Sequence, residues 1–413
     1  MKLFIVAVPF FNADIAVVAY ELRYQSCEKL FGMSQSFGSI DDMLNSPGLD
    51  LLDMVGLEPF TGGKPIFIPV NKFLLLTNFY ENIVIEPNLI TCIVSDDIPI
   101  EEVYIERYWN LKERGFNLAL KDVKLSEETL PLFQLADYYM VDASTKETLV
   151  DAMPIRSKLP DIQFVFIRIA SKEAFDSIKF VPASLFEGRF YSQPITKGVT
   201  QLSPLKVSAI ELLRLSEEVD FDIIEVSKVI AQDPSLSISL LKFINSPAVG
   251  VPSKISSINH AVALLGQLET VKWIKVAVSM YMAEDKPNEI TKLSLTRARF
   301  AENLAAPFGM EQFSSALFLM GIFSILDVVL EMPMDKAMDT IGVDENIREA
   351  LVNRKGRFGD IINFIYSYEQ SDWEKCSYTM VLKEIDVEDI NKAYLESLFW
   401  YRSILNDLQN ATK

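Results

Sequence analysis

The pattern of this sequence changes near residue 195, and that change limits the folds open to the chain. Before it, short apolar runs alternate with polar, helix-compatible segments such as 100–114 and 172–178. The apolar runs lie at residues 3–11, 65–70, 118–120, 138–141 and 164–169. This alternation indicates βα units around a parallel sheet. About seven or eight units fit in the span, so we expect a βα barrel.

After residue 195 the strand-like runs stop and helix signals follow one another. Asp222 is placed to cap one helix, and Asp233 followed by Pro234 supplies an N-cap and a first-turn proline for the next. The fold class predicted is α/β followed by all-α. We expect a barrel over residues 1–195 and a helical domain over residues 200–413.

Composition and charge exclude several classes of partner. The chain has 413 residues, 49% of them hydrophobic, which is enough for more than one core. The formal net charge of −18 opposes binding to nucleic acid or to an anionic membrane. The longest strongly apolar stretch, 316–326, is shorter than the ~20 residues of a membrane-spanning helix. We expect a soluble protein with neither a nucleic-acid nor a membrane partner.

The cysteines indicate the redox compartment. Cys27, Cys92 and Cys376 lie far apart, without the spacing of a metal site or a disulfide framework. We expect buried thiols in a cytoplasmic protein.

Both halves contain segments that resemble known bacterial signalling domains. FEGRFYSQP at 186–194 is similar to the phrase that closes EAL domains, the cyclic di-GMP phosphodiesterases, and YELRYQ at 20–25 is similar to their opening Glu-Ala-Leu signature. The second half resembles the HDOD domain, a catalytically silent relative of the HD phosphohydrolases. Its matching segments are DP at 233–234, LLKFINSPAVG at 240–250, ISSINHAVALLG at 255–266 and ALFLMGIFSILDVVL at 316–330. The resemblance implies a divergent EAL-type, TIM-like barrel followed by an all-helical HDOD domain.

The EAL resemblance also implies a set of metal ligands, of which two plausible remnants survive. EAL enzymes hold two divalent metals between carboxylates and an asparagine at the ends of barrel strands. Glu21 stands at the position of the signature glutamate, and Asp142 at that of a Lys-x-Asp aspartate. Asp122 is what remains of an Asp-Asp pair, and Glu187 replaces a late glutamine. These four residues are the expected remnants of the barrel mouth.

Most other ligand positions hold residues that cannot bind a metal. By this resemblance they are Pro69, Thr91, Val94, Lys121 and Ile167, and Met140 stands where the family has the lysine that steadies the nucleophile. A metal cluster that lacks so many ligands would bind too weakly to work. The position of the family's phosphate-binding arginine is Gln25, although Arg23 lies nearby. We expect no catalytic residue, no metal or cofactor, weak or no binding of cyclic di-GMP, and a mouth of solvated or mutually paired charges.

The helical half lacks the residues of HD metal chemistry. HD hydrolases bind their metal through several histidines and a His-Asp pair, whereas this chain contains a single histidine, His260. The expected His-Asp position is Ser324 followed by Ile325. We expect His260 to have a hydrogen-bonded structural role on a helix.

One function requires nothing that the sequence lacks: a non-enzymatic regulatory or scaffolding protein in bacterial signal transduction, acting through protein contacts. Two alternatives are open. A cyclic di-GMP receptor without hydrolysis needs a basic phosphate clamp, and a residual phosphodiesterase needs a full set of metal ligands. We expect protein partners, with a homodimer as one form of assembly.

Three segments of the helical half carry the aromatic residues and methionines that are enriched at interfaces, although the same residues also build helical cores. They lie at 279–285, 331–338 and 395–405. The residues that we expect to make contacts, where exposed, are Met280, Tyr281, Trp400 and Tyr401.

Overall fold

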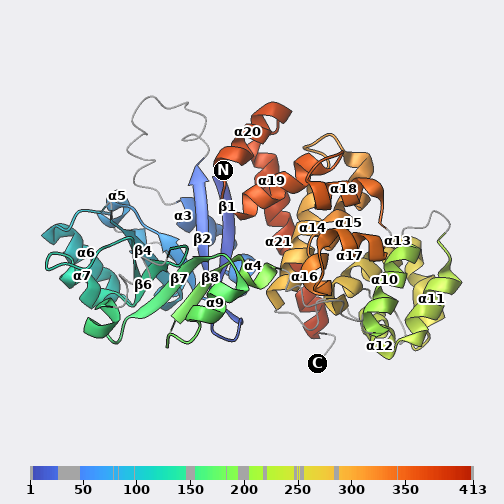
Figure 1. The fold of residues 1–413 in the computed structure, drawn as a ribbon, viewed down its shortest axis with the longest axis horizontal. Coiled ribbons are helices and arrows are strands. Elements are labelled where there is room, and N and C mark those ends of the chain that lie inside the picture. The colour runs from blue at the N-terminus through green and yellow to red at the C-terminus, as the bar shows by residue number, and fades with distance from the viewer. Residues whose placement is uncertain are drawn as a thin grey trace. The chain divides into compact units, whose positions relative to one another are not determined.

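The computed structural model places most of the chain in a barrel and a set of helices (Figure 1). It describes residues 3–26, 47–77, 79–81, 83–96, 98–145, 154–182, 184–193, 204–216, 221–245, 249, 251, 255–282, 288–341 and 343–410.

Eight strands close into a barrel in chain order, which confirms the predicted barrel. They are β1 (Leu3–Phe11), β2 (Val17–Ser26), β3 (Ile66–Pro69), β4 (Ile90–Ser95), β5 (Asn117–Lys121), β6 (Tyr138–Asp142), β7 (Gln163–Ile169) and β8 (Ser184–Gly188). β1 is antiparallel to β2 and β8, and all other neighbours are parallel. The first unit is therefore a hairpin rather than a βα unit. The Asn12 side chain orders its turn by accepting hydrogen bonds from the backbone N–H groups of Asp14 and Ala16, at 3.0 and 2.9 Å.

Helices and short 3₁₀ turns connect the parallel strands. The helices are α3 (Pro47–Val55), α4 (Glu58–Thr61), α5 (Lys72–Leu75), α6 (Glu102–Glu113), α7 (Leu130–Leu135) and α9 (Lys172–Ile178), and the 3₁₀ turns are η1 (Phe79–Glu81), η2 (Pro87–Leu89) and η3 (Arg189–Ser192). The predicted helices at 100–114 and 172–178 are confirmed as α6 and α9. Ser171 caps α9 by accepting a hydrogen bond from the Ala174 N–H.

Apolar side chains fill the interior of the barrel. They alternate along the strands, as the period of two in a strand requires. The buried cluster consists of Phe10, Ala19, Phe67, Ile93, Ala119, Met140, Val165 and Ile167, with Tyr138 and Leu185 packed against it. The barrel is therefore a packed core rather than a pore.

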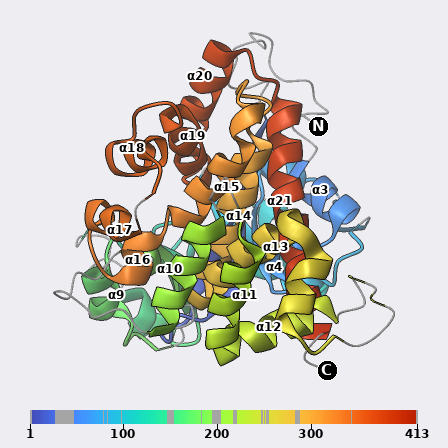
Figure 2. The ribbon, with the colours of Figure 1, turned by 90° about the vertical axis from the view of Figure 1, so that its right-hand side faces the viewer.

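Every regular element described after residue 204 is helical, as predicted. The helices are α10 (Pro204–Ser216), α11 (Ile223–Gln232), α12 (Pro234–Ile244), α13 (Ile258–Met282), α14 (Asn288–Asn303), α15 (Ser314–Phe323), α16 (Leu326–Leu330), α17 (Met334–Ile341), α18 (Glu345–Asn353), α19 (Gly359–Glu369), α20 (Trp373–Lys383) and α21 (Val387–Asn410), with a 3₁₀ turn, η4 (Glu311–Phe313). Asp222 caps α11 as predicted, accepting hydrogen bonds from the N–H groups of Ile224 and Glu225. α10, α11 and α12 all pack against α13 (Figure 2). α13 is kinked at Gly266, whose φ of 70° favours glycine.

The chain divides into two compact units, and the division is not contiguous in sequence. One unit consists of Met1–Gln193 and Ser367–Asn391, and the other of Pro194–Tyr366 and Lys392–Lys413. The expected helical domain was continuous over 200–413, but residues 367–391 pack with the barrel. The reason is aromatic packing: the ring of Phe4 on β1 stacks on Trp373 of α20, with 5.2 Å between centroids.

Two further observations bear on the chemistry of the chain. No described helix combines the length and the apolar character needed to cross a membrane. Cys92 and Cys376 are buried free thiols, whereas Cys27 lies outside the described residues.

Candidate functional site

The mouth of the barrel, where the parallel strands end, contains the remnant carboxylates. Glu21 lies on β2, Asp142 is the last residue of β6, and Glu187 lies near the end of β8. Functional groups of βα barrels gather at these strand ends, so a catalytic or binding site of this barrel would lie here. Asp122 follows β5 directly, but its side chain is exposed.

Arg23 joins two of these carboxylates. Its Nε and Nη2 atoms both donate to Glu21 Oε2, at 2.9 and 2.6 Å, and Nη2 lies 3.5 Å from Glu187 Oε1. Both glutamates are buried. Burial alone would lower the pKa of the guanidinium, but attraction from Glu21 and Glu187 and hydrogen bonds to both outweigh it and raise that pKa above its usual value. The two carboxylates thus share one fixed cation.

Arg168 extends this network to Asp142. Its backbone N–H donates to Glu187 Oε2 at 2.9 Å, and its side chain forms an ion pair with Asp142. The second Asp142 oxygen, Oδ1, accepts a hydrogen bond from the Ser144 N–H at 2.9 Å. Burial opposes ionisation of Asp142, but the bonds from Ser144 and the charge of Arg168 prevail and lower its pKa.

A bulge in β7 makes this arrangement possible. The pairing of β7 with β8 shifts between Phe166 and Ile169, and Arg168 within the shift has a φ of 61°. Gly188 has a φ of 149°, and a Cβ atom there would lie 2.2 Å from the Ile169 carbonyl oxygen. Glycine is therefore required where β8 approaches the bulge.

The positions that the resemblance assigns to metal ligands, and to the lysine that steadies the nucleophile, do not fit a metal site. Met140 and Ile167 belong to the apolar interior, and Thr91 and Val94 are buried. The backbone carbonyl of Pro69 accepts a hydrogen bond from the Tyr24 hydroxyl at 3.4 Å. Within the described part of the chain, no three His, Cys, Asp or Glu side chains are grouped as metal ligands would be. Arginines bind the carboxylates that a divalent metal would need.

The structure thus unites three of the four predicted mouth residues, Glu21, Asp142 and Glu187, through two arginines. The sequence prediction of mutually paired charges anticipated such a network but not its cations. Arg23 was noted only as a neighbour of Gln25, and Arg168 was missed. A sequence signal for Arg168 was available, since it is the one charged residue in the strand QFVFIRI.

In the helical unit, a hydroxyl and an arginine occupy the expected position of the His-Asp pair. Ser324 Oγ accepts a hydrogen bond from Nη1 of the buried Arg297 at 3.1 Å and donates to the Gly321 carbonyl oxygen at 2.7 Å. Nearby, burial raises the pKa of the Asp327 carboxyl. The expectation for His260 was wrong: the residue is exposed, and only its backbone N–H makes a recorded hydrogen bond, to Ser257 Oγ at 3.4 Å. The residue faces water because it lies on the outer side of α13.

The residues expected to make protein contacts differ in exposure. Tyr401 is buried, Trp400 is half-buried with its ring 5.7 Å from that of Phe318, and Phe399 is 47% exposed. Ala337 and Met338 in the segment 331–338 are buried. The side chains of Met280 and Tyr281 lie outside the described residues.

Comparison with known proteins finds a family match within the helical half and two relatives of the whole chain. The HDOD domain family matches residues 202–355. The uncharacterized protein YuxH of Bacillus subtilis is 27% identical over 417 residues, covering 98% of this chain and 100% of that protein. The cyclic di-GMP phosphodiesterase CdgJ of Vibrio cholerae is 26% identical over 404 residues, covering 96% of this chain and 91% of that protein.

Two solved structures are similar to the N-terminal region of the chain. The phosphodiesterase PaMucR in complex with cyclic di-GMP is 13% identical, with a TM-score of 0.37, and the match covers 46% of this chain and 94% of that one. The EAL enzyme Bd1971, bound to cAMP and cyclic di-GMP, is 11% identical with a TM-score of 0.35. That match covers 47% of this chain and 62% of Bd1971, which is less than two-thirds of its length.

Proposed function

Because residues 202–355 are an HDOD domain that follows a closed eight-stranded barrel, we propose that this protein is a non-enzymatic regulatory protein of bacterial signal transduction that acts through protein contacts. The observation that carries the proposal is the pairing of Arg23 with Glu21 and Glu187. Metal-assisted cleavage of a phosphodiester needs free carboxylate oxygens around the metal. Here Arg23 binds one oxygen of Glu21 and lies beside one oxygen of Glu187, and the backbone N–H of Arg168 binds the other Glu187 oxygen.

The barrel interior supports the same proposal. By the EAL resemblance, phosphodiester cleavage would require a lysine at Met140 and a glutamate at Ile167, yet both side chains are buried among apolar neighbours. Placing a charged metal next to them would carry a large desolvation cost without ligands to offset it. The side chains at these positions stabilise the barrel rather than bind a metal.

The helical half is the part that we propose makes the contacts. It has no His-Asp pair, and its expected position is filled by the Ser324–Arg297 hydrogen bond. Its surface exposes large apolar side chains, such as Ile224 on α11 at 78% and Leu264 on α13 at 52%. A domain that works through protein contacts could bury such side chains against its partner, and removing them from water would stabilise the complex.

Partner capture with matched variants tests this proposal. Ile224→Asp, Leu264→Asp and Phe399→Asp together should reduce capture of specific partners from the native cytoplasm at least tenfold. The control carries Met54→Asp, Val84→Asp and Phe180→Asp, which change apolar residues of the barrel unit that are at least as exposed. Both variants must melt as the wild type does. Loss of capture in the control alone, or in neither variant, would contradict a contact surface on the helical half.

A second candidate function is cyclic di-GMP turnover or binding. The observation that favours it is the relative CdgJ, which is named a cyclic di-GMP phosphodiesterase and aligns with 96% of this chain. Under this alternative the Arg23 and Arg168 network would open to admit the nucleotide and its metals. A direct turnover assay separates the two candidates.

A further inference from the structure

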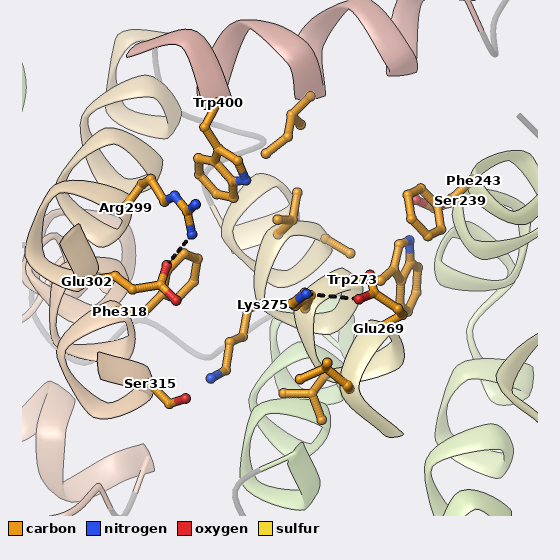
Figure 3. A pocket seen from close by; sticks show the side chains of 16 residues that line it. Ser239, Phe243, Glu269, Trp273, Lys275, Arg299, Glu302, Ser315, Phe318 and Trp400 are labelled. Atoms are coloured by element: carbon orange, nitrogen blue, oxygen red, sulfur yellow. Dashed lines mark hydrogen bonds and ion pairs between the residues drawn. The ribbon is translucent and has the colours of Figure 1, made fainter. Parts of the chain in front are cut away.

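The helical unit contains a cavity of about 400 Å³, far from the residues of the barrel mouth in sequence. Its walls come from α12, α13, α14, α15 and α21 (Figure 3). This volume lies within the ~300–1,000 Å³ of small-molecule sites.

Aromatic rings form much of the cavity wall. Phe243, Trp273, Phe318 and Trp400 all line it. The rings of Phe318 and Trp400 meet edge to face, 5.7 Å apart at 89°. Such walls favour a flat apolar ligand, because a flat ring can stack on the wall rings or pack edge to face against them.

Charged side chains stand beside these rings. Lys275 Nζ lies 5.7 Å from the Phe318 ring centroid, and the Arg299 guanidinium lies 5.7 Å from that of Trp400. Arg299 also donates to Glu302 Oε2 at 2.7 Å, and on the other side Lys272 pairs with Glu269 at 2.8 Å. In Figure 3 the Lys275 side chain lies between these two ion pairs.

The balance of charge in the cavity wall favours an anion over a cation. Three cationic and two anionic side chains line it, which leaves it net positive in a chain whose net charge is −18. Lys275 is only 6% exposed, so an anionic group beside it would interact across a medium of low dielectric, where charge attraction is stronger than in water. A ligand ring against Phe318 or Trp400 would have one of the two cations within reach.

We propose that this cavity binds a small planar aromatic anion, with its ring against Phe318 and Trp400 and its carboxylate or phosphate beside Lys275 and Arg299. The proposal is independent of the barrel and of the protein contacts proposed above. It gives the HDOD domain a ligand that could change its surface without any catalytic step.

Calorimetric titration with matched pairs of probes tests the proposal. Indole-3-acetate is compared with indole, and adenosine 5′-monophosphate with adenosine; acetate and inorganic phosphate supply the anion without the ring. At least one aromatic anion should bind tenfold or more tightly than its neutral counterpart and than the anion alone. The pair that shows this preference identifies the ligand as a carboxylate or a phosphate. Equal binding of charged and neutral probes, or no binding at millimolar concentration, would overturn the proposal.

Three variants locate the binding. Lys275→Met keeps the length of the side chain. It should weaken binding of the aromatic anion at least tenfold and leave binding of the neutral counterpart unchanged. The control Lys242→Met removes the same charge from an exposed side chain of α12 that does not line the cavity, and should change affinity less than threefold. Ser315→Trp adds bulk at an exposed position of the cavity lining and should weaken the binding of charged and neutral probes alike.

Thermal melting of each variant separates misfolding from loss of the site. If Lys275→Met does not fold, Ser315→Trp, which changes no charge, tests the location by itself. Equal losses in the two lysine variants, or unchanged binding in a folded Ser315→Trp protein, would place the anion elsewhere and refute the inference.

Discussion

The ring of Phe4 lies parallel to the indole of Trp373, with 4° between their planes, although the two residues stand at opposite ends of the chain. Tyr368 completes the cluster: its ring meets Trp373 edge-on at 5.3 Å, and its hydroxyl accepts a hydrogen bond from the Ile5 N–H at 3.4 Å. Residues 367–391 are thus a structural part of the barrel unit.

Replacing Trp373 should therefore destabilise the barrel. Trp373→Ala removes a buried ring and should cost about 3 kcal/mol of unfolding free energy. Hydrogen exchange of the β1 amides should become faster with it. Tyr378→Ala on the same helix changes a side chain that is 68% exposed and should alter stability by less than about 0.5 kcal/mol. Unchanged β1 exchange in Trp373→Ala would show that the segment does not support the barrel.

The two described cysteines should be unreactive in the native protein. Burial raises the pKa of Cys92 and of Cys376 to about 12. At pH 8 about one thiol in ten thousand would be ionised, and the thiolate is the reactive form. In a Cys27→Ser variant, Ellman's reagent should react with neither thiol until denaturant is added and then with both. Rapid stoichiometric reaction without denaturant would contradict their burial.

The fold was predictable because the sequence patterns of its strands and helices are local. The site was less predictable because the residues that pair in it are distant in sequence. Alternating apolar runs predicted β5, β6 and β7, and Asp222 predicted the start of α11. No local pattern could place residues 367–391 on the barrel, since that depends on the contact of Trp373 with a strand at the other end of the chain. The carboxylates at the barrel mouth were predicted from their positions in the sequence. The pairing of Asp142 with Arg168 was not, because it depends on the bulge that turns Arg168 toward Asp142.

The lowered pKa of Asp142 predicts a pH-dependent contribution to stability. A carboxyl whose pKa is lower folded than unfolded, where it is about 3.9, stabilises the fold above that value. This contribution disappears as the pH falls through the folded pKa. Asp142→Asn should lower stability by less than about 1 kcal/mol at pH 7, because Arg168 is largely exposed. In urea unfolding at several pH values, the difference in unfolding free energy between Asp142→Asn and the wild type should shrink toward pH 3. A difference that stays constant with pH would contradict this prediction.

Arg23 should matter more to stability than Arg168. Arg23→Gln leaves Glu21 and Glu187 buried without their shared cation and should cost about 3 kcal/mol in urea unfolding. Arg168→Gln, the matched change of a side chain that is 58% exposed, should cost less than about 1 kcal/mol. Adding Glu21→Gln and Glu187→Gln to Arg23→Gln should recover much of the loss. Equal costs for the two arginine variants would show that the mouth does not depend on Arg23.

Cyclic di-GMP turnover by the purified full-length protein tests the central proposal most directly. With Mg²⁺ or Mn²⁺ in excess, linearised product should stay at the level of the no-enzyme control, because arginines bind Glu21, Asp142 and Glu187. A triple variant, Glu21→Gln, Asp142→Asn and Glu187→Gln, separates true activity from a contaminating enzyme. Product above the control that is lost in this triple variant would show that the barrel is a working phosphodiesterase and contradict the non-enzymatic account.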